Sequence, residues 1–360
     1  MKFKNMVTTL IASFLFLITA IVPSSFAKTI EIKVGSYEPE GHYLVQYVYV
    51  PYTQEIERRT NGQVKFKWYH GGSLVKAPQT YDAMTGGLVD MVVTLGVFTM
   101  QSRFPVSNVM TLPFLFDSTV QVDRVYQKAY DTIPEFRAEY KDIVMLGFHA
   151  SDFFNLHIHK DLKAPRTLED MKGLKICAVS KTFVEVTQLL GATPRSLKPE
   201  DAYMSLQRKA IDGCFWPTAP LAKWKLTDLT SHHTLVYGPF VQVPMAMAER
   251  TWKTLPPDVQ AVFNEMRPSV TDFCGAIVDN RRASTLNKLK ERKDEIYTLP
   301  DDEKARWVDA MKPMYDRWLN EMKEKGIDGE KILAQIRSYA KEYRGTQYVK
   351  ANWWGDQWQE

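Results

Sequence analysis

Several side chains between residues 149 and 177 are of the types that nucleophilic catalysis uses. Cys177 offers a thiol, while His149, His157, His159 and Asp152 offer bases and a carboxylate. A nearby base activates a thiol of this kind by taking its proton. These positions match no recognisable catalytic spacing, and they are explained equally well as strand surface. We therefore expect a protein that is not an enzyme, with periplasmic enzyme activity as a weaker alternative.

The chain has three cysteines, Cys177, Cys214 and Cys274. An odd number in a chain of this length does not form a disulfide framework. Cys177 and Cys214 are expected on neighbouring strands, where a disulfide or a metal site shared with a histidine are alternatives to free thiols. Their spacing matches no metal signature, so we favour three separate buried thiols. We expect no metal and no cofactor.

Residues 1–27 have the composition of a secretory signal peptide. Two lysines precede a largely apolar stretch over residues 6–22, and Ser25-Phe26-Ala27 forms a small-x-small cleavage site. The apolar stretch is short for a membrane span. Because no cysteine lies near the cleavage site, we expect a cleaved, secreted protein without a lipid anchor.

Composition and charge limit the kinds of partner. The chain has 360 residues, of which 45% are hydrophobic and 24% charged, as is ordinary for a folded protein. Single cores stop growing near about 250–300 residues, so more than one core is expected. The net charge of +4 falls to +2 without the signal, which carries two lysines and no acid. This near-neutral charge argues against nucleic acid as a partner.

Strands alternate with helices along most of the chain up to residue 215. Apolar patterning predicts strands over about 30–34, 64–68, 91–95, 143–148, 156–158, 174–179 and 211–215. Helices are expected over about 42–59, 78–86, 183–190 and 199–208, and Pro51 should kink the first of them or start its second part. This alternation predicts α/β units around mainly parallel sheets. Tyr81 and Tyr203 each precede an Asp by nine positions in similar segments, which suggests two similar lobes.

Beyond Pro256 the pattern is mostly helical. A long amphipathic helix should run to about Glu295 with a kink at Pro268. Further helices are expected over 301–325 and 329–343. The tail carries Trp353, Trp354 and Trp358. We expect these tryptophans to pack on the body, with a membrane or partner surface as the weaker alternative.

Nine short motifs occur in an order that is typical of one receptor family. They are Pro39-Glu40-Gly41-His42, Thr60-Asn61-Gly62, Gly71-Gly72-Ser73-Leu74, Gly87-Leu88-Val89-Asp90, Thr111-Leu112-Pro113-Phe114-Leu115-Phe116, Glu169-Asp170-Met171-Lys172-Gly173-Leu174-Lys175, Leu190-Gly191-Ala192-Thr193-Pro194, Ile211-Asp212-Gly213 and Leu255-Pro256-Pro257-Asp258-Val259. Each is weak evidence alone, but nine in this order are specific. Over almost all of its mature length the chain resembles the DctP-type extracytoplasmic receptors of TRAP transporters, which are ATP-independent periplasmic uptake systems.

This resemblance implies an α/β fold of the two-lobe periplasmic binding protein kind, type II-like, with a long helix spanning both lobes. Lobe I is expected over 28–150 and about 235–265, and lobe II over 151–234 and about 266–300. Residues 301–360 should form C-terminal helices that pack on the body. The ligand should lie between the lobes, where closure buries it from both sides.

The resemblance also implies a function without catalysis. The protein should be a periplasmic monomer that captures a small organic solute and delivers it to a membrane permease of a small and a large subunit. A sensory receptor that presents its ligand to a membrane kinase is an alternative that the sequence does not separate from transport.

The sequence departs from the family where the ligand is held. In most relatives the strand over 174–179 carries an Arg that clamps the ligand carboxylate, and this chain has Cys177 there. A thiol is too small and too weak a donor to form that clamp. By the same resemblance, Phe154 or His157 replaces a second Arg, Trp216 replaces an Asn, and Phe98 replaces an Arg found in some relatives.

The expected ligand-binding residues are Glu38, Thr94, Phe98, Phe154, His157, Cys177, Ser180 and Trp216. Burying a bare carboxylate among them would cost several kcal/mol, so a simple C4-dicarboxylate or sialic acid is not the expected ligand. An uncharged, partly apolar or aromatic molecule fits better, as does a cation over aromatic faces near Glu38. A third alternative keeps the carboxylate and pairs it with His157, Arg195 or Lys198.

Overall fold

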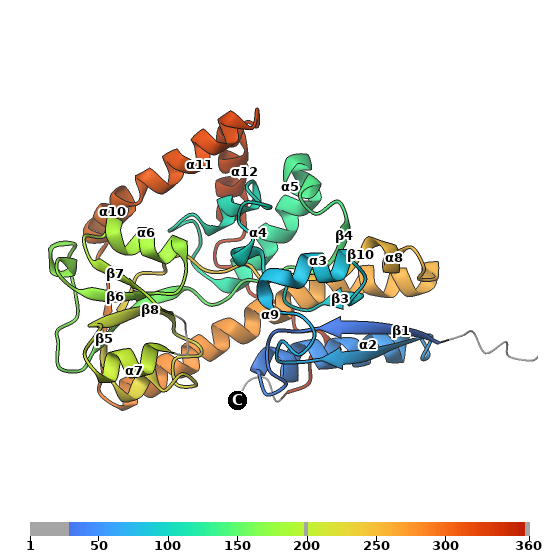
Figure 1. Cartoon of the computed structure of the whole chain (residues 1–360), viewed down its shortest axis with the longest axis horizontal. Coiled ribbons are helices and arrows are strands. Elements are labelled where there is room, and N and C mark those ends of the chain that lie inside the picture. The colour runs from blue at the N-terminus through green and yellow to red at the C-terminus, as the bar shows by residue number, and fades with distance from the viewer. Residues whose placement is uncertain (1–28, 198–200, 357–360) are drawn as a thin grey trace, which may run out of the picture.

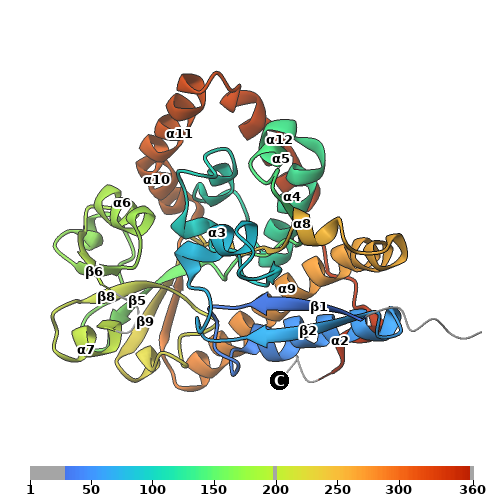
Figure 2. The ribbon, with the colours of Figure 1, turned by 45° about the vertical axis from the view of Figure 1, so that its right-hand side comes forward.

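The structure, a computed structural model, describes residues 29–197 and 201–356. The expected signal peptide lies outside the described residues, as do Lys198, Pro199 and Trp358. Two β-sheets lie side by side with helices packed around them, as Figure 1 and Figure 2 show. The strand ends of both sheets position the candidate site.

The first sheet has five strands in the order β2-β1-β3-β10-β4. Their bounds are β1 Ile30–Gly35, β2 Val64–Tyr69, β3 Met91–Val92, β4 Ile143–Gly147 and β10 Met245–Ala248. β1 runs parallel to β2 and β3, whereas β10 runs antiparallel to β3 and β4. The strand predicted over 91–95 is therefore shorter than expected, and β10 was not predicted.

The second sheet has six strands in the order β11-β9-β5-β8-β6-β7. Their bounds are β5 Phe154–His159, β6 Lys175–Ala178, β7 Thr193–Ser196, β8 Gly213–Pro217, β9 Thr230–Leu235 and β11 Glu295–Thr298. β5 runs antiparallel to β8 and β9, and the other pairs are parallel. The expected parallel character is thus correct except for one antiparallel strand in each sheet.

Helices connect and cover the strands. Their bounds are α2 Val50–Arg59, α3 Thr80–Thr85, α4 Thr119–Thr132, α5 Pro134–Ala138, α6 Lys181–Leu189, α7 Ala202–Gln207 and α8 Glu249–Trp252. A π-helical turn, Val45–Tyr49, leads into α2, and Pro51 lies in the first turn of α2. Proline is tolerated there because that N–H has no partner within the helix. The helices α4 and α5 were not among the predicted helices.

The longest helix, α9 (Pro257–Glu291), contains 35 residues and continues through Pro268. It contacts α2, α4 and β4 on the side of the first sheet and β11 on the side of the second. Figure 1 shows α9 running from the side of the second sheet to the side of the first. The predicted spanning helix is therefore present. The helix is unbroken at Pro268, where the sequence predicts a kink.

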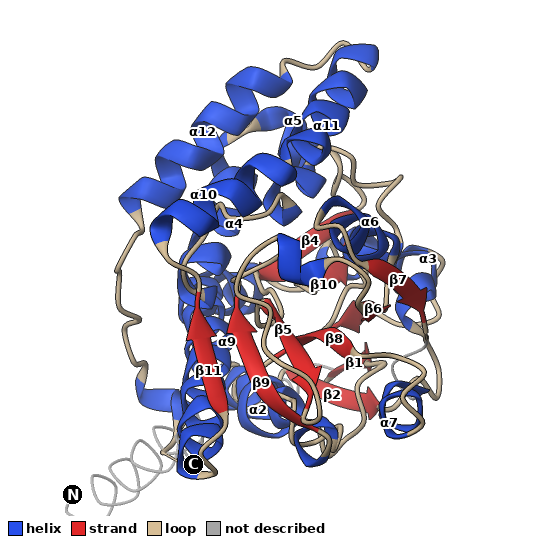
Figure 3. Ribbon diagram, turned by 90° about the vertical axis from the view of Figure 1, so that its left-hand side faces the viewer, coloured by secondary structure: helices blue, strands red, loops and turns tan. Residues whose placement is uncertain are grey.

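The C-terminal part is helical and lies apart from the strands. It comprises α10 Asp301–Ala310, α11 Lys312–Glu324 and α12 Gly329–Glu342, which Figure 3 shows on the same side of the molecule as α4 and α5. The single helix expected over 301–325 is divided at Met311. Trp354 stacks on Phe273 of α9 with ring centroids 4.4 Å apart, so the expected packing of the tail is confirmed for this residue.

The chain passes between the two sheets three times, through residues 148–153, through residues 236–244 and along α9. The first two segments pair as a short antiparallel ribbon, in which Ser151 N donates to Val241 O at 2.8 Å and Val243 N to His149 O at 3.0 Å. This ribbon and α9 are the connections at which a two-lobe protein bends. The division of the chain between the sheets resembles the expected lobes, and the lobe limits stay a prediction.

Candidate functional site

A cavity of about 270 Å³ lies where strands of both sheets end. In the first sheet the residues after β1, β3 and β4 supply Glu38, Thr94 and His149, and in the second the end of β6 and β8 supplies Ser180 and Trp216. Ligand sites of open α/β folds lie at such carboxyl ends of strands, because the chain leaves the sheet there and opens a crevice. The position of the cavity therefore follows from the order and direction of the strands.

Aromatic and aliphatic side chains make up most of the cavity wall. They are Tyr37, Tyr43, Leu44, Phe98, Phe154, Val179, Trp216, Pro217, Pro220, Trp224, Val241 and Val243. Phe154 is fixed by stacking on Phe183 at 4.0 Å, and Trp216 packs edge-on against Trp224 at 5.3 Å. Such a wall binds ligands through apolar area and ring stacking.

Four buried polar atoms of the cavity wall have no hydrogen bond of normal geometry among the described residues. They are His42 Nδ1, Thr94 Oγ1, His149 Nε2 and Trp216 Nε1. Leaving a buried donor or acceptor unpaired costs about 1–3 kcal/mol. A ligand that pairs with these atoms would recover that free energy, so they mark where its polar groups belong.

Glu38 and His42 follow β1 and face the cavity together. His42 Nε2 lies 3.6 Å from Glu38 Oε2. Burial raises the pKa of Glu38 to about 7, and the charge of Lys223 opposes this rise. Burial, with a smaller effect of Lys223, lowers the pKa of His42 to about 3, so the imidazole is neutral at neutral pH. His149 is likewise neutral, because burial lowers its pKa to about 3.

The second carboxylate of the cavity wall belongs to the ribbon between the sheets. Asp152 Oδ1 accepts a hydrogen bond from Arg282 Nη1 of α9 at 2.6 Å, and its other oxygen accepts from Ala219 N at 2.8 Å. Burial raises the pKa of the Asp152 carboxyl, and Arg282 opposes that rise. Arg282 also bonds Asp279. Asp152 is therefore paired within the protein, whereas Glu38 is not paired with a lysine or arginine within the described part of the chain.

Six of the eight residues expected to bind ligand line this cavity, namely Glu38, Thr94, Phe98, Phe154, Ser180 and Trp216. Cys177 and His157 do not. Cys177 lies on the face of β6 that packs against Ala202 and Leu206 of α7, and its thiol is too short to reach the cavity. His157 lies in the same row of the sheet, beside Cys214, where its Nε2 bonds Trp216 O at 3.1 Å and its Nδ1 bonds His233 Nδ1 at 2.8 Å.

The cysteines are free and buried in the structure. Cys177 and Cys214 are neighbours in register on β6 and β8, as the sequence predicts, but they are not bridged. Among the residues that the structure describes, no group of three or more His, Cys, Asp or Glu side chains is arranged to hold a metal ion.

Sequence reasoning missed several lining residues. Tyr37, His42 and Tyr43 flank Glu38 in the same loop, so their closeness in sequence was an available signal. Trp224 and Val241 come from irregular segments far from any motif. They reach the cavity only through the path of the chain between the sheets.

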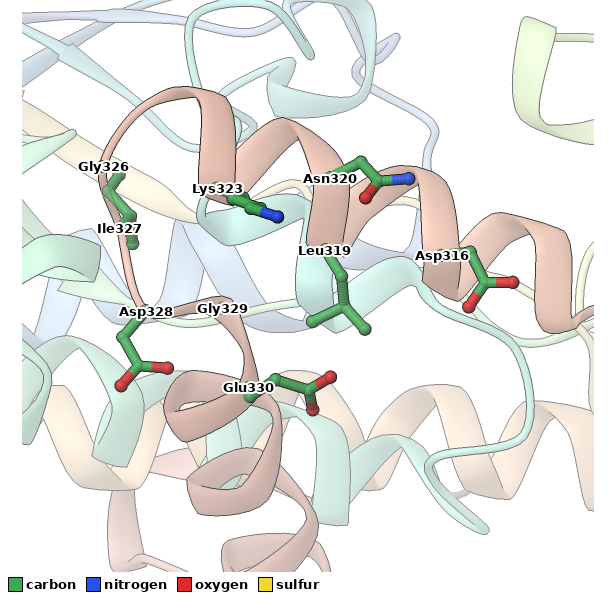
Figure 4. Close-up of a pocket in the computed structure, with 9 residues that line it drawn as sticks. All are labelled: Asp316, Leu319, Asn320, Lys323, Gly326, Ile327, Asp328, Gly329 and Glu330. Carbon is green, nitrogen blue, oxygen red and sulfur yellow. The ribbon is translucent and has the colours of Figure 1, made fainter.

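A larger hollow of about 790 Å³ lies between α11 and α12, and Figure 4 shows its lining residues. Asp316, Asn320, Lys323, Asp328 and Glu330 are exposed there. Charged groups that remain solvated give a ligand little binding free energy. The enclosed, mainly apolar cavity at the strand ends is therefore the candidate site.

The family model described as bacterial extracellular solute-binding protein, family 7, named DctP, matches residues 34–322. The chain belongs to the DctP family. The resemblance to TRAP receptors inferred from the nine motifs is thereby confirmed.

Individual DctP relatives are distant. The C4-dicarboxylate-binding periplasmic protein DctP of Vibrio cholerae is 23% identical over 295 residues, which cover 80% of this chain and 84% of that protein. A TRAP periplasmic solute-binding protein of Desulfovibrio salexigens has a TM-score of 0.79 at 24% identity, covering 91% of this chain and 99% of that one. A TRAP solute-binding protein of Rhodoferax ferrireducens, in complex with copurified benzoate, has a TM-score of 0.76 at 22% identity, covering 88% and 99%.

These structural likenesses show a two-lobe binding-protein fold for this DctP protein. They do not transfer a ligand, because likeness at 22% and 24% sequence identity shows the fold alone. None of the helices within residues 29–197 and 201–356 is long and apolar enough to cross a membrane.

Proposed function

We propose that this DctP-family protein is a periplasmic receptor that captures a small, largely apolar or aromatic solute and delivers it to the two membrane subunits of a TRAP permease. The cavity carries this proposal, because rings and aliphatic side chains line it and no Arg or Lys does so within the described residues. Simple dicarboxylates and sialic acid are therefore not its ligands, since their charges would be buried unpaired. The protein acts as a cleaved, unanchored monomer.

Closure follows from where the ligand lies. His149, Ser151, Val241 and Val243 belong to the ribbon that joins the sheets, and all four line the cavity. A ligand that touches the ribbon and both sheets gains contacts when the sheets approach, so it stabilises the closed state relative to the open one. This closed state is the form that a permease or, in the alternative role, a membrane kinase would recognise.

The test is a ligand screen on the purified mature protein. We expect monocyclic aromatic compounds to raise the melting temperature and to reduce the radius of gyration in solution scattering, and we expect succinate and malate to do neither. Trp216→Ala should weaken binding of the aromatic compounds by about tenfold or more, since a buried ring contributes at least about 1.5 kcal/mol. Arg344→Ala, far from the cavity, is the matched control and should bind normally.

Two results would refute the receptor proposal in its present form. One is recovery of succinate or malate from the freshly purified protein by mass spectrometry. The other is chemical turnover of a bound compound that Cys177→Ala abolishes, which would indicate an enzyme. A permease gene pair beside the gene would favour transport over sensing.

A further inference from the structure

We infer that the cleft binds a monocyclic aromatic amine, with the ammonium group paired to Glu38 and the ring held among the aromatic side chains of the cavity. This inference rests on the proposed receptor function and specifies the charge of the ligand. Four features of the cavity support it: an unmatched carboxylate, a described wall that includes no Lys or Arg, aromatic faces next to that carboxylate, and unpaired acceptors.

Glu38 is the unmatched carboxylate. Of the two acidic residues in the cavity wall, Asp152 has the guanidinium of Arg282 at 2.6 Å. Glu38 has as its nearest basic partner His42, whose Nε2 is 3.6 Å from Oε2 and which is neutral at neutral pH because burial lowers its pKa to about 3. A charge removed from water without a partner is unstable unless a ligand supplies the opposite charge.

The charged groups that face Glu38 from other elements leave its carboxylate free to pair with a cationic ligand. Lys223, on the loop after β8, lowers the pKa of Glu38, but it is exposed and does not line the cavity. Asp152 and Arg281 act on the phenol of Tyr43 in opposite directions, and the guanidinium of Arg281 lies 5.8 Å from the centroid of that ring. Because Asp152 is paired with Arg282, Glu38 is the carboxylate of the described cavity wall that has no Lys or Arg partner, which favours a cationic ligand over a carboxylate.

Aromatic faces lie beside the carboxylate. Tyr37 and Tyr43 are close enough for the charge of Glu38 to add to burial in raising the pKa of both phenols. Both rings are thus neutral, and they line the cavity with Phe98 and Trp216. An ammonium group over such a face gains roughly 0.5–2 kcal/mol, and the volume of about 270 Å³ suits one substituted ring.

Acceptor atoms of the cavity wall provide further hydrogen bonds for the ammonium group. An ammonium group has three N–H donors. Thr94 Oγ1 is one acceptor: the Tyr37 hydroxyl is its neighbour, but no hydrogen bond of normal geometry reaches it from the described residues. His149 is another, because its Nδ1 faces Asp123 Oδ2 at 3.4 Å and a proton held there leaves Nε2 with a free lone pair. These atoms offer acceptors that Glu38 alone does not supply.

Isothermal titration with three probes of one size tests the inference: 2-phenylethylamine, 2-phenylethanol and phenylacetate. At pH 8 the amine should bind at least about tenfold more tightly than the alcohol, and phenylacetate should bind most weakly. Burial raises the pKa of Glu38 to about 7, whereas an alkylammonium titrates near about 10.4. Protonation of Glu38 should therefore make the affinity for the amine about tenfold lower at pH 6 than at pH 8.

Two variants separate this inference from the receptor function. Glu38→Gln should lower the affinity for the amine about tenfold and remove its pH dependence, while binding of the alcohol stays within about twofold. Glu40→Gln removes an exposed carboxylate of the same loop and should leave all three affinities unchanged. Tighter binding of phenylacetate or the alcohol, or an unaffected Glu38→Gln variant, would overturn the amine inference and keep the receptor. Failure of all three probes to bind would overturn both.

Discussion

At the scale of single residues, the resemblance makes positions 177 and 216 the main departures from the family. Cys177 and Trp216 belong to one buried cluster, which also includes Ala202 and Leu206 of α7. Trp216 lines the cavity and Cys177 does not. Because the two side chains share this cluster, we expect the exchange of Arg for Cys177 and of Asn for Trp216 to act as a pair.

This pairing predicts how the family residues would behave if they were restored. Cys177→Arg alone should lower the free energy of unfolding by about 1–3 kcal/mol through overpacking and should not create succinate binding. The double variant with Trp216→Asn should bind succinate more tightly than the wild type, by about tenfold or more, since a bidentate charge-assisted pair contributes roughly 1.5–3 kcal/mol.

Titration with succinate measures the affinity of both variants. Urea unfolding monitored by circular dichroism measures their stability. Cys177→Ala is the control and should not gain affinity for succinate. Tight succinate binding by Cys177→Arg alone would show that the two exchanges do not act as a pair.

At the scale of elements, α9 holds the cleft together through buried polar contacts. Arg282 joins this helix to Asp152 of the ribbon, and Thr271 of the same helix accepts from Phe148 N at 3.1 Å through its hydroxyl. Close packing adds to this, because a Cβ at Gly275 would lie 2.7 Å from Val120 Cα of α4. The ribbon is thus positioned by the helix that connects the two sheets.

Removal of the Arg282 guanidinium from its contact with Asp152 should lower the stability of the protein. Arg282→Met is expected to lower the free energy of unfolding by about 3–5 kcal/mol, since it leaves Asp152 buried without a counter-charge. Adding Asp152→Asn should recover part of that loss, and chemical denaturation of the single and double variants measures the coupling. Lys253→Met, which breaks the exposed pair with Glu249, is the matched control and should change stability by less than about 1 kcal/mol. Equal losses of stability in Arg282→Met and Lys253→Met would contradict this role of the buried pair.

At the scale of the whole molecule, the C-terminal segment returns to the first sheet. After α12 the chain runs back to α9 and α2, where Trp354 is 3% exposed and stacks on Phe273. Trp353 lies beside Tyr52 of α2 with ring centroids 6.0 Å apart. The tail therefore links α2 to α9, the helix that spans both sheets.

Trp354→Ala should consequently destabilise the protein by about 3–5 kcal/mol, the usual cost of removing a large buried ring. Urea unfolding of the full chain measures this effect, and Val349→Ala, at a position that is 72% exposed, should stay within about 0.5 kcal/mol of the wild type. A Trp354→Ala variant as stable as the control would mean that the tail packs without contributing to stability.

The sequence by itself determined the family, the α/β alternation and the spanning helix. These follow from motifs, from apolar periodicity and from the start signal at Pro256-Pro257, all of which are local properties of the chain. It also named six residues that line the cavity, of which Phe98, Phe154 and Trp216 came from the family resemblance. The helix α4 has a local start signal in the N-cap Ser118, which the sequence interpretation overlooked, whereas the four-residue strand β10 has no turn signal of its own.

Only the tertiary structure decided which side chains face the ligand. Cys177 and His157 share one row and one face of the second sheet, and α7 and the His157–His233 contact keep them in the interior. Trp224, Val241 and the pairing of Arg282 with Asp152 likewise depend on segments that meet only after folding. The physical reason is that a strand pattern gives the two faces of a sheet but not what covers each face, and burial and charge pairing depend on that covering.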